Sequence, residues 1–285
     1  MFKDTFFPAK ITIRLNDTLI DLSRPVVMGI LNITPDSFYA GSRVITTQEV
    51  VDRAGKMLAD GAFILDMGAM STRPGAEAIS ANEEIDRLLP AMEAVHQAFP
   101  LAYLSADTYR ADVAKLAAAS GAAMINDVSG GALDEDMFST MAQLKLPYVL
   151  MHMRGTPATM QQHASYENLM VELMQELHNK LNQLHQLGVT DLILDPGFGF
   201  AKTNEHNFKL LHQLNELCAL GYPVLVGFSR KSMIYKSLKS TPEEALNGTT
   251  VLNTIALSQG ARILRVHDVQ PAVEAIQLWE KTIYA

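Results

Sequence analysis

Eight short apolar segments recur along the chain, and each carries a polar residue at or near its end. They read VVMGILN (26–32), FILDMG (63–68), AYLSAD (102–107), AMINDV (123–128), YVLMH (148–152), LILDPG (192–197), VLVGFS (224–229) and RILRVHD (262–268). Short apolar runs bounded by Pro, Gly or charged residues are typical of parallel strands covered on both faces. The pattern therefore predicts eight buried strands.

Segments with helical periodicity lie between these strands. They include residues 46–61, 80–99, 109–121, 166–188 and 241–260. Glycines near the ends of such segments predict left-handed helix termini, at Gly61, Gly121, Gly188, Gly221 and Gly260. Alternating strands and helices fit either an open doubly wound α/β sheet or a closed (β/α)₈ TIM barrel, and the count of eight favours the barrel.

The segment before the first strand has a different period. Residues 10–22, KITIRLNDTLIDL, alternate apolar and polar side chains around Asn16 and Asp17. This pattern predicts a short N-terminal β-hairpin that closes the N-terminal end of the barrel. No change of composition marks a linker, so residues 1–285 are predicted to form one domain.

Composition excludes several classes of partner. The formal charge of −8 and the pI near 5.5 argue against a nucleic-acid surface. No segment approaches the ~20 apolar residues of a membrane helix, and no secretory apolar segment is seen, so the expected location is cytoplasmic. The one cysteine, Cys218, is interpreted as a small buried hydrophobic residue.

Polar residues at the strand ends are the main candidates for chemistry. They are Asn32, Asp66, Asp107, Asn126, Asp127, His152, Asp195, Ser229, Arg230, Lys231, Arg265, His267 and Asp268. A single Asp or Asn in such a place often only caps a helix or braces a turn. In a parallel barrel, however, all eight carboxyl ends meet on one rim, which is where barrels hold their active sites. Eight polar ends in succession therefore predict a binding site.

The candidate cations suggest an anionic ligand. Arg73, the tetrad Ser229–Ser232, Arg265 and His267 offer two guanidinium forks, an ammonium and an imidazole, which suit a pyrophosphate-sized group. The alternative for Arg73 is plain surface charge.

Asp107, Asn126 and Asp195 suit a different ligand edge. Carboxylates and an amide can pair with the adjacent N–H donors and carbonyl of a planar heterocycle. A metal site is the competing interpretation, but no zinc or calcium motif is present, and only Mg²⁺ held by one side chain and the ligand's phosphates fits. The sequence also lacks a complete dinucleotide fingerprint and a GxSxG nucleophile elbow.

Seven motifs in order resemble one family. They are MGILNITPDSF, STRPGA, INDVSGG, LMHMRGTPATMQ, LDPGFGFAK, LVGFSRKS and RVHDV, which span about residues 26 to 270. Together they resemble the dihydropteroate synthases, pterin-binding enzymes of folate biosynthesis. The resemblance implies a (β/α)₈ barrel and a homodimer. It also implies a transferase that condenses p-aminobenzoate with 6-hydroxymethyl-7,8-dihydropterin pyrophosphate in the presence of Mg²⁺, giving 7,8-dihydropteroate and pyrophosphate.

The resemblance also implies roles for individual residues. The pterin site falls on Asp107, Asn126, Met151, Asp195, Phe200 and Lys231. The pyrophosphate site falls on Asn32, Arg73, Arg265 and His267, with Asn32 also near Mg²⁺. The p-aminobenzoate site falls on Thr72, Pro74, Phe200, Lys231 and Ser232. The expected catalytic set is Asp107, Asp195, Lys231, Arg265 and His267.

Charge development predicts an SN1-like step. Negative charge grows on the leaving pyrophosphate and positive charge on the pterin methylene, so that cations stabilise the first and carboxylates the second. Three departures from the family pattern lie in loops: Ala69 with Met70, Ala201, and residues 39–42. Two other functions therefore stay open, a pterin-dependent methyltransferase and a non-catalytic pterin-binding paralogue.

Overall fold

The computed structural model describes residues 11–34, 46–71 and 79–283. Its main sheet is parallel, with the strand order β8-β7-β6-β5-β4-β3-β10-β9. The strands are β3 (Val26–Asn32), β4 (Ile64–Gly68), β5 (Tyr103–Asp107), β6 (Ala122–Asp127), β7 (Tyr148–Met151), β8 (Leu192–Asp195), β9 (Leu225–Val226) and β10 (Ile263–Val266). All eight predicted strands are therefore confirmed.

The sheet closes between β8 and β9. Leu194 forms a parallel bridge with Val224, and the Leu194 N–H donates to the Pro223 carbonyl at 2.9 Å. This contact completes a (β/α)₈ barrel and excludes the open doubly wound sheet. β9 is shorter than the predicted 224–229 because the chain leaves the sheet after Val226 and turns, with Arg230 in the left-handed region at φ 55°.

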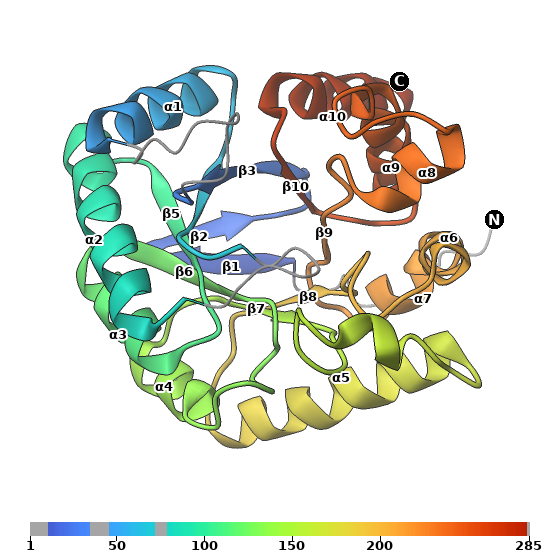
Figure 1. Cartoon of the computed structure of the whole chain (residues 1–285), viewed down its shortest axis with the longest axis horizontal. Coiled ribbons are helices and arrows are strands. Elements are labelled where there is room, and N and C mark those ends of the chain that lie inside the picture. Colours follow the sequence, from blue (N-terminus) through green and yellow to red (C-terminus); the bar gives the residue numbers. More distant parts are fainter. Residues whose placement is uncertain (1–10, 35–45, 72–78, 284–285) are drawn as a thin grey trace.

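Helices surround the barrel (Figure 1). They are α1 (Thr47–Ala59), α2 (Ala81–Ala98), α3 (Ala111–Ala119), α4 (Met137–Leu144), α5 (Leu169–Gln186), α6 (Asn204–His212), α7 (Leu214–Cys218), α8 (Ser232–Leu238), α9 (Leu246–Ser258) and α10 (Val269–Ile283), with a 3₁₀ turn, η2 (Met160–His163). Thr46 and Glu49 form a capping box at the start of α1. All five glycines predicted to be left-handed have positive φ, between 84° and 108°.

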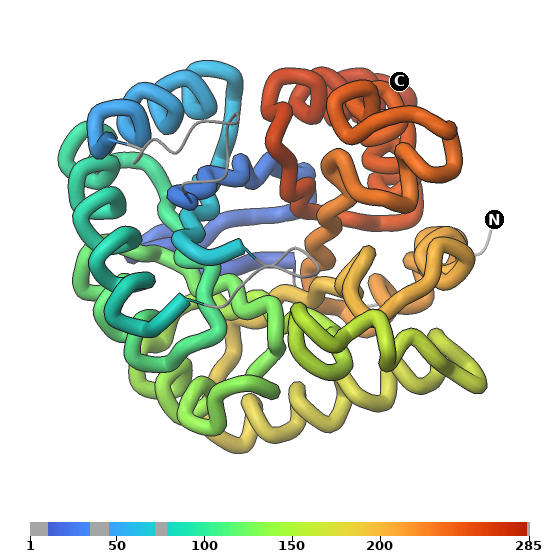
Figure 2. The backbone as a smooth tube through the Cα atoms, viewed as in Figure 1, coloured from blue at the N-terminus to red at the C-terminus, as the bar shows by residue number. Residues whose placement is uncertain are grey.

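The N-terminal hairpin closes one end of the barrel, as the alternation predicted. β1 (Thr12–Leu15) pairs antiparallel with β2 (Thr18–Asp21), and Asn16 occupies the turn at φ 51°. Ile13 and Leu15 are fully buried, and they pack in one cluster with inward-facing strand residues such as Ile64 and Ile263. Figure 2 shows the hairpin, coloured blue, lying across the middle of the barrel. This end is therefore filled with apolar side chains.

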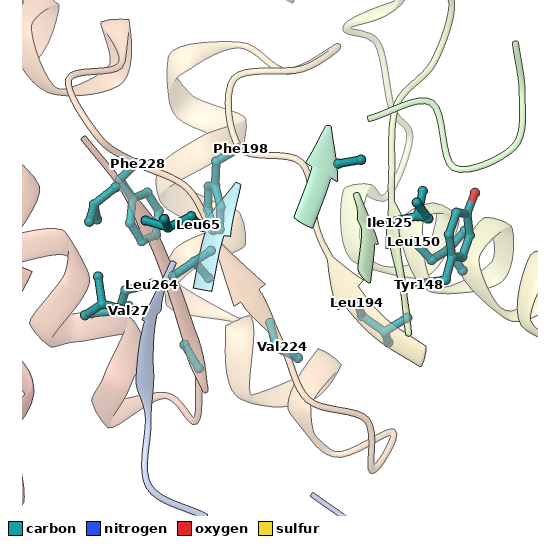
Figure 3. Close-up of a cluster of buried hydrophobic side chains, with 14 of the residues drawn as sticks. Val27, Leu65, Ile125, Tyr148, Leu150, Leu194, Phe198, Val224, Phe228 and Leu264 are labelled. Atoms are coloured by element: carbon teal, nitrogen blue, oxygen red, sulfur yellow. The ribbon is translucent and has the colours of Figure 1, made fainter. Parts of the chain in front are cut away.

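Alternation along each strand separates two layers of side chains. Outward residues such as Val27, Leu65 and Leu264 belong to the main core, which also contains helix residues. Figure 3 shows these three side chains within that core. Inward residues at the N-terminal ends of the strands pack instead with the hairpin. Because strand side chains alternate with a period of two, the residue two positions after an inward apolar residue also faces the interior, nearer the carboxyl end. The candidate site is therefore expected in the barrel interior, near the carboxyl ends of the strands.

Candidate active site

The residues that follow the inward apolar residues by two positions form the other end of the interior, and most of them are polar. Asp66 follows Ile64, Asp195 follows Ile193, Arg265 follows Ile263, Asn126 follows Met124, and Met151 follows Val149. Asp107 ends β5, and its Cβ lies 3.2 Å from the position that a Cβ on Gly68 would occupy. The interior is thus apolar at the hairpin end and mainly charged at the other.

Arg265 connects three strands at this polar end. Its Nε donates to Asp66 Oδ2 at 2.6 Å, and its Nη2 donates to Asp107 Oδ2 at 2.5 Å. Asn126 Nδ2 donates to the same Asp66 oxygen at 2.9 Å. Asp66 is fully buried and Asp107 is 7% exposed. The structure therefore brings Asp107, Asn126 and Arg265 together around Asp66.

Asp195 and Lys231 form the other half of the cluster. Asp195 Oδ1 accepts a hydrogen bond from the Gly197 N–H at 2.7 Å, and Lys231 Nζ donates to the Phe198 carbonyl at 2.5 Å. A Cβ placed on Gly227 would lie 3.9 Å from both Lys231 Nζ and Arg265 Cβ. Lys231 and Arg265 are therefore neighbours across this glycine, and the two halves form one cluster at the carboxyl end of the barrel.

Two of the predicted apolar walls border the same cluster. Met151 and Ala201 belong to one buried group of side chains, and Phe200, which is partly buried, packs against this group. Lys231 Nζ lies 4.7 Å from the centroid of the Phe200 ring, a cation–π distance. A flat ligand between these side chains would contact apolar and charged atoms together.

Burial shifts the pKa values of Asp107, Asp195 and Lys231 towards neutrality. It raises the pKa of Asp107 to about 7, against the opposing charge of Arg265, whose attraction is shared with Asp66. It also raises the pKa of Asp195, which Lys231 counteracts. Burial lowers the pKa of Lys231 to about 8, although Asp195 favours its charged form. For Arg265 burial lowers the pKa, but Asp66 and Asp107 outweigh it and the net shift is upward.

The other predicted site residues lie along the same rim or outside the described residues. His267 follows β10, and its Nδ1 lies 2.9 Å from Ser229 Oγ. Asn32 ends β3 opposite Gly68, and Ser232 is the first residue of α8. Thr72, Arg73 and Pro74 fall in residues 72–78, outside the described residues, as does the departure at residues 39–42.

Three strand-end residues have a bracing role instead. Asp127 accepts hydrogen bonds from Tyr148 Oη, Ser129 N and Gly131 N, each at 2.7 Å, on the side of β6 opposite to Asn126. Asp268 forms a two-bond ion pair with Arg230, at 2.9 Å for each bond. The turn-bracing alternative is therefore correct for these residues.

Two buried polar residues near this cluster, Asp66 and Lys202, have no role in the sequence-based prediction. Asp66 was noted as a strand end but received no role, although it holds both Arg265 and Asn126. Its spacing of two after Ile64, the same spacing as that of Asp195 after Ile193, was the available signal. Lys202 is 3% exposed, and its Nζ lies beside the loop that follows β8.

The remaining departures from the family pattern are buried. Ala69 is fully buried and Met70 is 8% exposed directly after β4. Ala201 is also fully buried and adopts a left-handed φ of 48°, which costs a non-glycine residue about 1–2 kcal/mol.

The fold and the site define a barrel that binds a pterin, and the chain belongs to the family of pterin-binding enzymes, whose model matches residues 28–267. Within that family its relatives are dihydropteroate synthases. The enzyme of Haemophilus influenzae is 41% identical over 273 residues, which cover 95% of this chain and 98% of that protein. The Escherichia coli K12 enzyme is 42% identical over 274 residues, 94% of this chain and 95% of that protein.

A solved structure of similar shape supports the same assignment. The Yersinia pestis dihydropteroate synthase, solved as a sulfonamide drug complex, superposes with a TM-score of 0.91 at 40% identity. The match covers 96% of this chain and all of that one, at 100%. No helix in the described part of this chain is long and apolar enough to span a membrane.

Proposed function

We infer that this chain catalyses the dihydropteroate synthase reaction, the condensation of p-aminobenzoate with 6-hydroxymethyl-7,8-dihydropterin pyrophosphate that releases pyrophosphate. It is a transferase of folate biosynthesis, like its relatives. The observation that carries the inference is the buried cluster of Asp66, Asp107, Asn126 and Arg265 beside Asp195 and Lys231. This cluster offers acceptors and donors for a pterin ring next to cations for its pyrophosphate.

The pterin is proposed to lie between Asp107, Asn126 and Asp195, with Lys231 at its edge. Ionised carboxylates accept hydrogen bonds from ring N–H and amino groups, and an ammonium donates to the ring carbonyl. Met151 and Phe200 would cover the ring faces. Because these groups are already placed by strands and by hydrogen bonds to one another, the site is preorganised for a flat ligand.

The leaving group is proposed to lie towards Asn32, Arg73, Arg265 and His267. Arg265 uses Nε and Nη2 for Asp66 and Asp107, so its remaining N–H groups can point towards a phosphate while the guanidinium stays fixed. Ser229 holds the His267 ring by contacts to its Nδ1 and backbone N–H. Such fixed donors stabilise charge that develops on a leaving group.

Mg²⁺ is a proposed cofactor, and the residues present fit one mode of binding. In the described part of the chain no group of three or more His, Cys, Asp or Glu side chains could hold a metal. Asn32 offers one amide oxygen at the end of β3, and Mg²⁺ commonly takes one or two protein ligands together with substrate phosphates and water. When bound, the ion would neutralise charge on the pyrophosphate.

The p-aminobenzoate is proposed to contact Phe200, Lys231 and Ser232, together with Thr72 and Pro74. A Thermus thermophilus dihydropteroate synthase with a TM-score of 0.85 and 41% identity was solved with 4-aminobenzoate. A carboxylate near Ser232 would face the backbone N–H groups of the start of α8.

The proposed chemistry follows from the charges. As the C–O bond to pyrophosphate breaks, Arg265 and His267 stabilise the negative leaving group, and Asp107 and Asp195 stabilise the cationic pterin methylene. The arylamine then attacks in an SN1-like step. It needs no protein nucleophile, because bond breaking supplies the electrophile.

The deciding experiment measures pyrophosphate release with both substrates and Mg²⁺. Release that requires p-aminobenzoate supports the synthase. Tight pterin binding without pyrophosphate release would instead indicate a non-catalytic pterin-binding paralogue. Corrinoid-dependent methyl transfer would indicate a pterin-dependent methyltransferase.

Replacing Lys231 by Met should lower turnover by about 10²-fold or more, the scale for one fixed electrostatic contact. The variant keeps the length and apolar character of the side chain but removes its charge. Steady-state pyrophosphate release measures the effect, and Lys236→Met, at an exposed position of the helix α8 that Lys231 precedes, is the control. Near-normal turnover of Lys231→Met would contradict the role.

Pterin affinity should depend on the protonation of Asp107. Because burial raises its pKa to about 7, the free site takes up a proton as the pH falls, and a pterin that binds the ionised form must displace it. The pterin Kd should therefore rise about tenfold between pH 8 and pH 6. The same shift makes the ligand-free protein lose stability as the pH rises from about 4 to about 7, because the folded state holds the proton longer.

Calorimetric titration of wild type and Asp107→Asn checks this prediction. The variant lacks the titrating group, so the difference between the two pH profiles separates Asp107 from Lys231, whose pKa lies near 8. Equal profiles would show that Asp107 does not control binding.

We also propose that the protein is a homodimer that acts in the cytoplasm. A groove of about 840 Å³ lies between α9 and α10, and Ile255 and Leu278 are 41% and 67% exposed on these helices. A second copy of the chain would cover these side chains. Sedimentation of the purified protein tests the dimer.

A further inference from the structure

The loop that follows β8 is held by side chains rather than by a backbone ladder. Each carbonyl oxygen from residue 197 to residue 201 accepts a hydrogen bond from a side chain. The donors, in order of the carbonyls, are Lys202 Nζ to Gly197 at 3.1 Å, Lys231 Nζ to Phe198 at 2.5 Å, Gln161 Nε2 to Gly199 at 3.4 Å, Lys202 Nζ to Phe200 at 3.1 Å and Tyr166 Oη to Ala201 at 3.0 Å.

The backbone conformation explains this arrangement. Gly197, Gly199 and Ala201 have positive φ, at 69°, 83° and 48°, so that successive carbonyls point in different directions and cannot be satisfied by one neighbouring strand. A side chain at Gly197 would overlap the His152 carbonyl, which lies 2.1 Å from the position of its Cβ. The loop therefore packs directly on the end of β7, and Phe198 packs on Phe228 at 4.4 Å between ring centroids (Figure 3).

Lys202 makes two of the five carbonyl contacts from beneath the loop. It is 3% exposed, and its Nζ also lies 3.1 Å from His152 Nδ1. Within the described residues it forms hydrogen bonds to these neutral groups but no ion pair with a carboxylate. A buried ammonium without a counter-ion is costly, and burial lowers the pKa of Lys202 to about 7, although Asp195 favours its charged form. An apolar residue of similar size would avoid this cost. The presence of a lysine at position 202 is therefore not explained by the stability of the fold.

His152 connects Lys202 to α5. Burial lowers the pKa of His152 to about 4, so the ring is neutral and Nδ1 can accept from Lys202. Its Nε2 lies 3.1 Å from Glu176 Oε2, and Arg154 contacts the same carboxylate group. His152 thus lies between Glu176 of α5 and Lys202. Its Nδ1 contacts Lys202, whereas its Nε2 makes no hydrogen bond within the described residues.

The loop in turn places three groups of the candidate site. Its Gly197 N–H donates to Asp195 Oδ1 at 2.7 Å, its Phe198 carbonyl accepts from Lys231, and its Phe200 ring lies 4.7 Å from Lys231 Nζ. We propose that Lys202 is a positioning residue. It fixes the backbone conformation of the loop at residues 197–201, and through this loop it fixes the positions from which Asp195 and Lys231 bind the pterin. This proposal rests on the pterin site of the proposed function, and Lys202 itself contacts no substrate.

The test compares Lys202→Met with Lys180→Met. Lys180 on α5 is half-buried, and the hydrogen bond that its Nζ donates within the described residues goes to the Ser129 carbonyl, at 3.3 Å, and not to the loop. Lys202→Met should weaken pterin binding about tenfold and lower turnover about 10²-fold, since small displacements of fixed groups have effects of this size. Its urea midpoint should stay close to that of the wild type, because removal of the buried charge offsets the loss of the donor to the Gly197 and Phe200 carbonyls. Lys180→Met should keep wild-type affinity and turnover.

A double-variant cycle distinguishes positioning from a general structural role. If Lys202 acts through Asp195, then Lys202→Met should weaken pterin binding much less in an Asp195→Asn background than in the wild type. Full additivity, or wild-type affinity of Lys202→Met, would overturn the proposal. Lys202→Gln, which keeps one donor, serves the same cycle if the Met variant does not fold.

Pterin affinity is measured by calorimetry without p-aminobenzoate, so this readout does not depend on catalysis. If the wild-type protein binds pterin without releasing pyrophosphate, the proposed function is wrong, and the positioning role of Lys202 can still be tested by pterin affinity. If the wild-type protein binds no pterin, both the proposed function and the positioning role are wrong.

Discussion

Replacing Asp195 by Asn should weaken pterin binding about 10²–10³-fold while changing the free energy of unfolding by less than about 1 kcal/mol. The pterin loses an ionic acceptor at the centre of its site. The fold loses little, because the Asn side-chain oxygen can still accept from the Gly197 N–H and because removal of a buried charge offsets the change. Calorimetric titration and urea unfolding measure the two quantities.

Asp127→Asn is the matched control, since Asp127 is also a buried carboxylate at a strand end. Both of its oxygens accept hydrogen bonds, so an amide NH₂ would face a donor and cost about 1–3 kcal/mol of stability. Its pterin affinity should stay close to that of the wild type. The assignment of Asp195 fails if Asp195→Asn unfolds the protein instead, which is the result that its strand-capping alternative predicts.

Replacing Arg265 by Met should destabilise the fold by about 3–5 kcal/mol, the usual cost of leaving buried charges without their partner. Asp66 and Asp107 would both lose the guanidinium that they share. Turnover should also fall by at least about 10²-fold, because the same side chain is proposed to hold the leaving group. Urea unfolding at pH 7 and pyrophosphate release measure these effects.

Two further variants separate the structural and catalytic parts of this effect. Arg262→Met removes a guanidinium that donates to the Ser23 carbonyl near the surface, and it should cost less than about 1 kcal/mol. The double variant Asp66→Asn/Arg265→Met removes one of the stranded charges, so it should regain stability without regaining turnover. Wild-type stability of Arg265→Met would show that the guanidinium is not needed to balance the carboxylates.

The barrel could be predicted because its strands are buried on both faces and therefore read as short apolar runs. The alternation of side chains along each strand identifies the inward-facing residues, which the positions of the strand ends alone do not. It separates Asn126, which faces the interior, from Asp127, which braces the next turn, and it places Asp66 inside with Asp195. The alternation of inward and outward side chains along β4, taken together with the position of Asp66 near the strand end, predicts that Asp66 faces the interior.

Other features depend on contacts that no local pattern specifies. Lys202 ends the motif LDPGFGFAK, but its three partners come from His152, which follows β7, and from the loop after β8. Only the folded structure therefore shows that its side chain is buried. The early end of β9 has a similar cause. Residues 227–229 look like strand, yet the turn at Arg230 and the His267 contact to Ser229 take the chain out of the sheet.

The short β9 makes the wall of the barrel uneven. Between β8 and β9 the described pairing is the single bridge of Leu194 with Val224, whereas β3 and β4 pair over five positions from Met28 to Asn32. Asp195 and Lys231 stand on opposite sides of that weak joint. A ligand that binds both of them must favour the closed joint, so occupancy of the site and local opening of the barrel wall are thermodynamically linked.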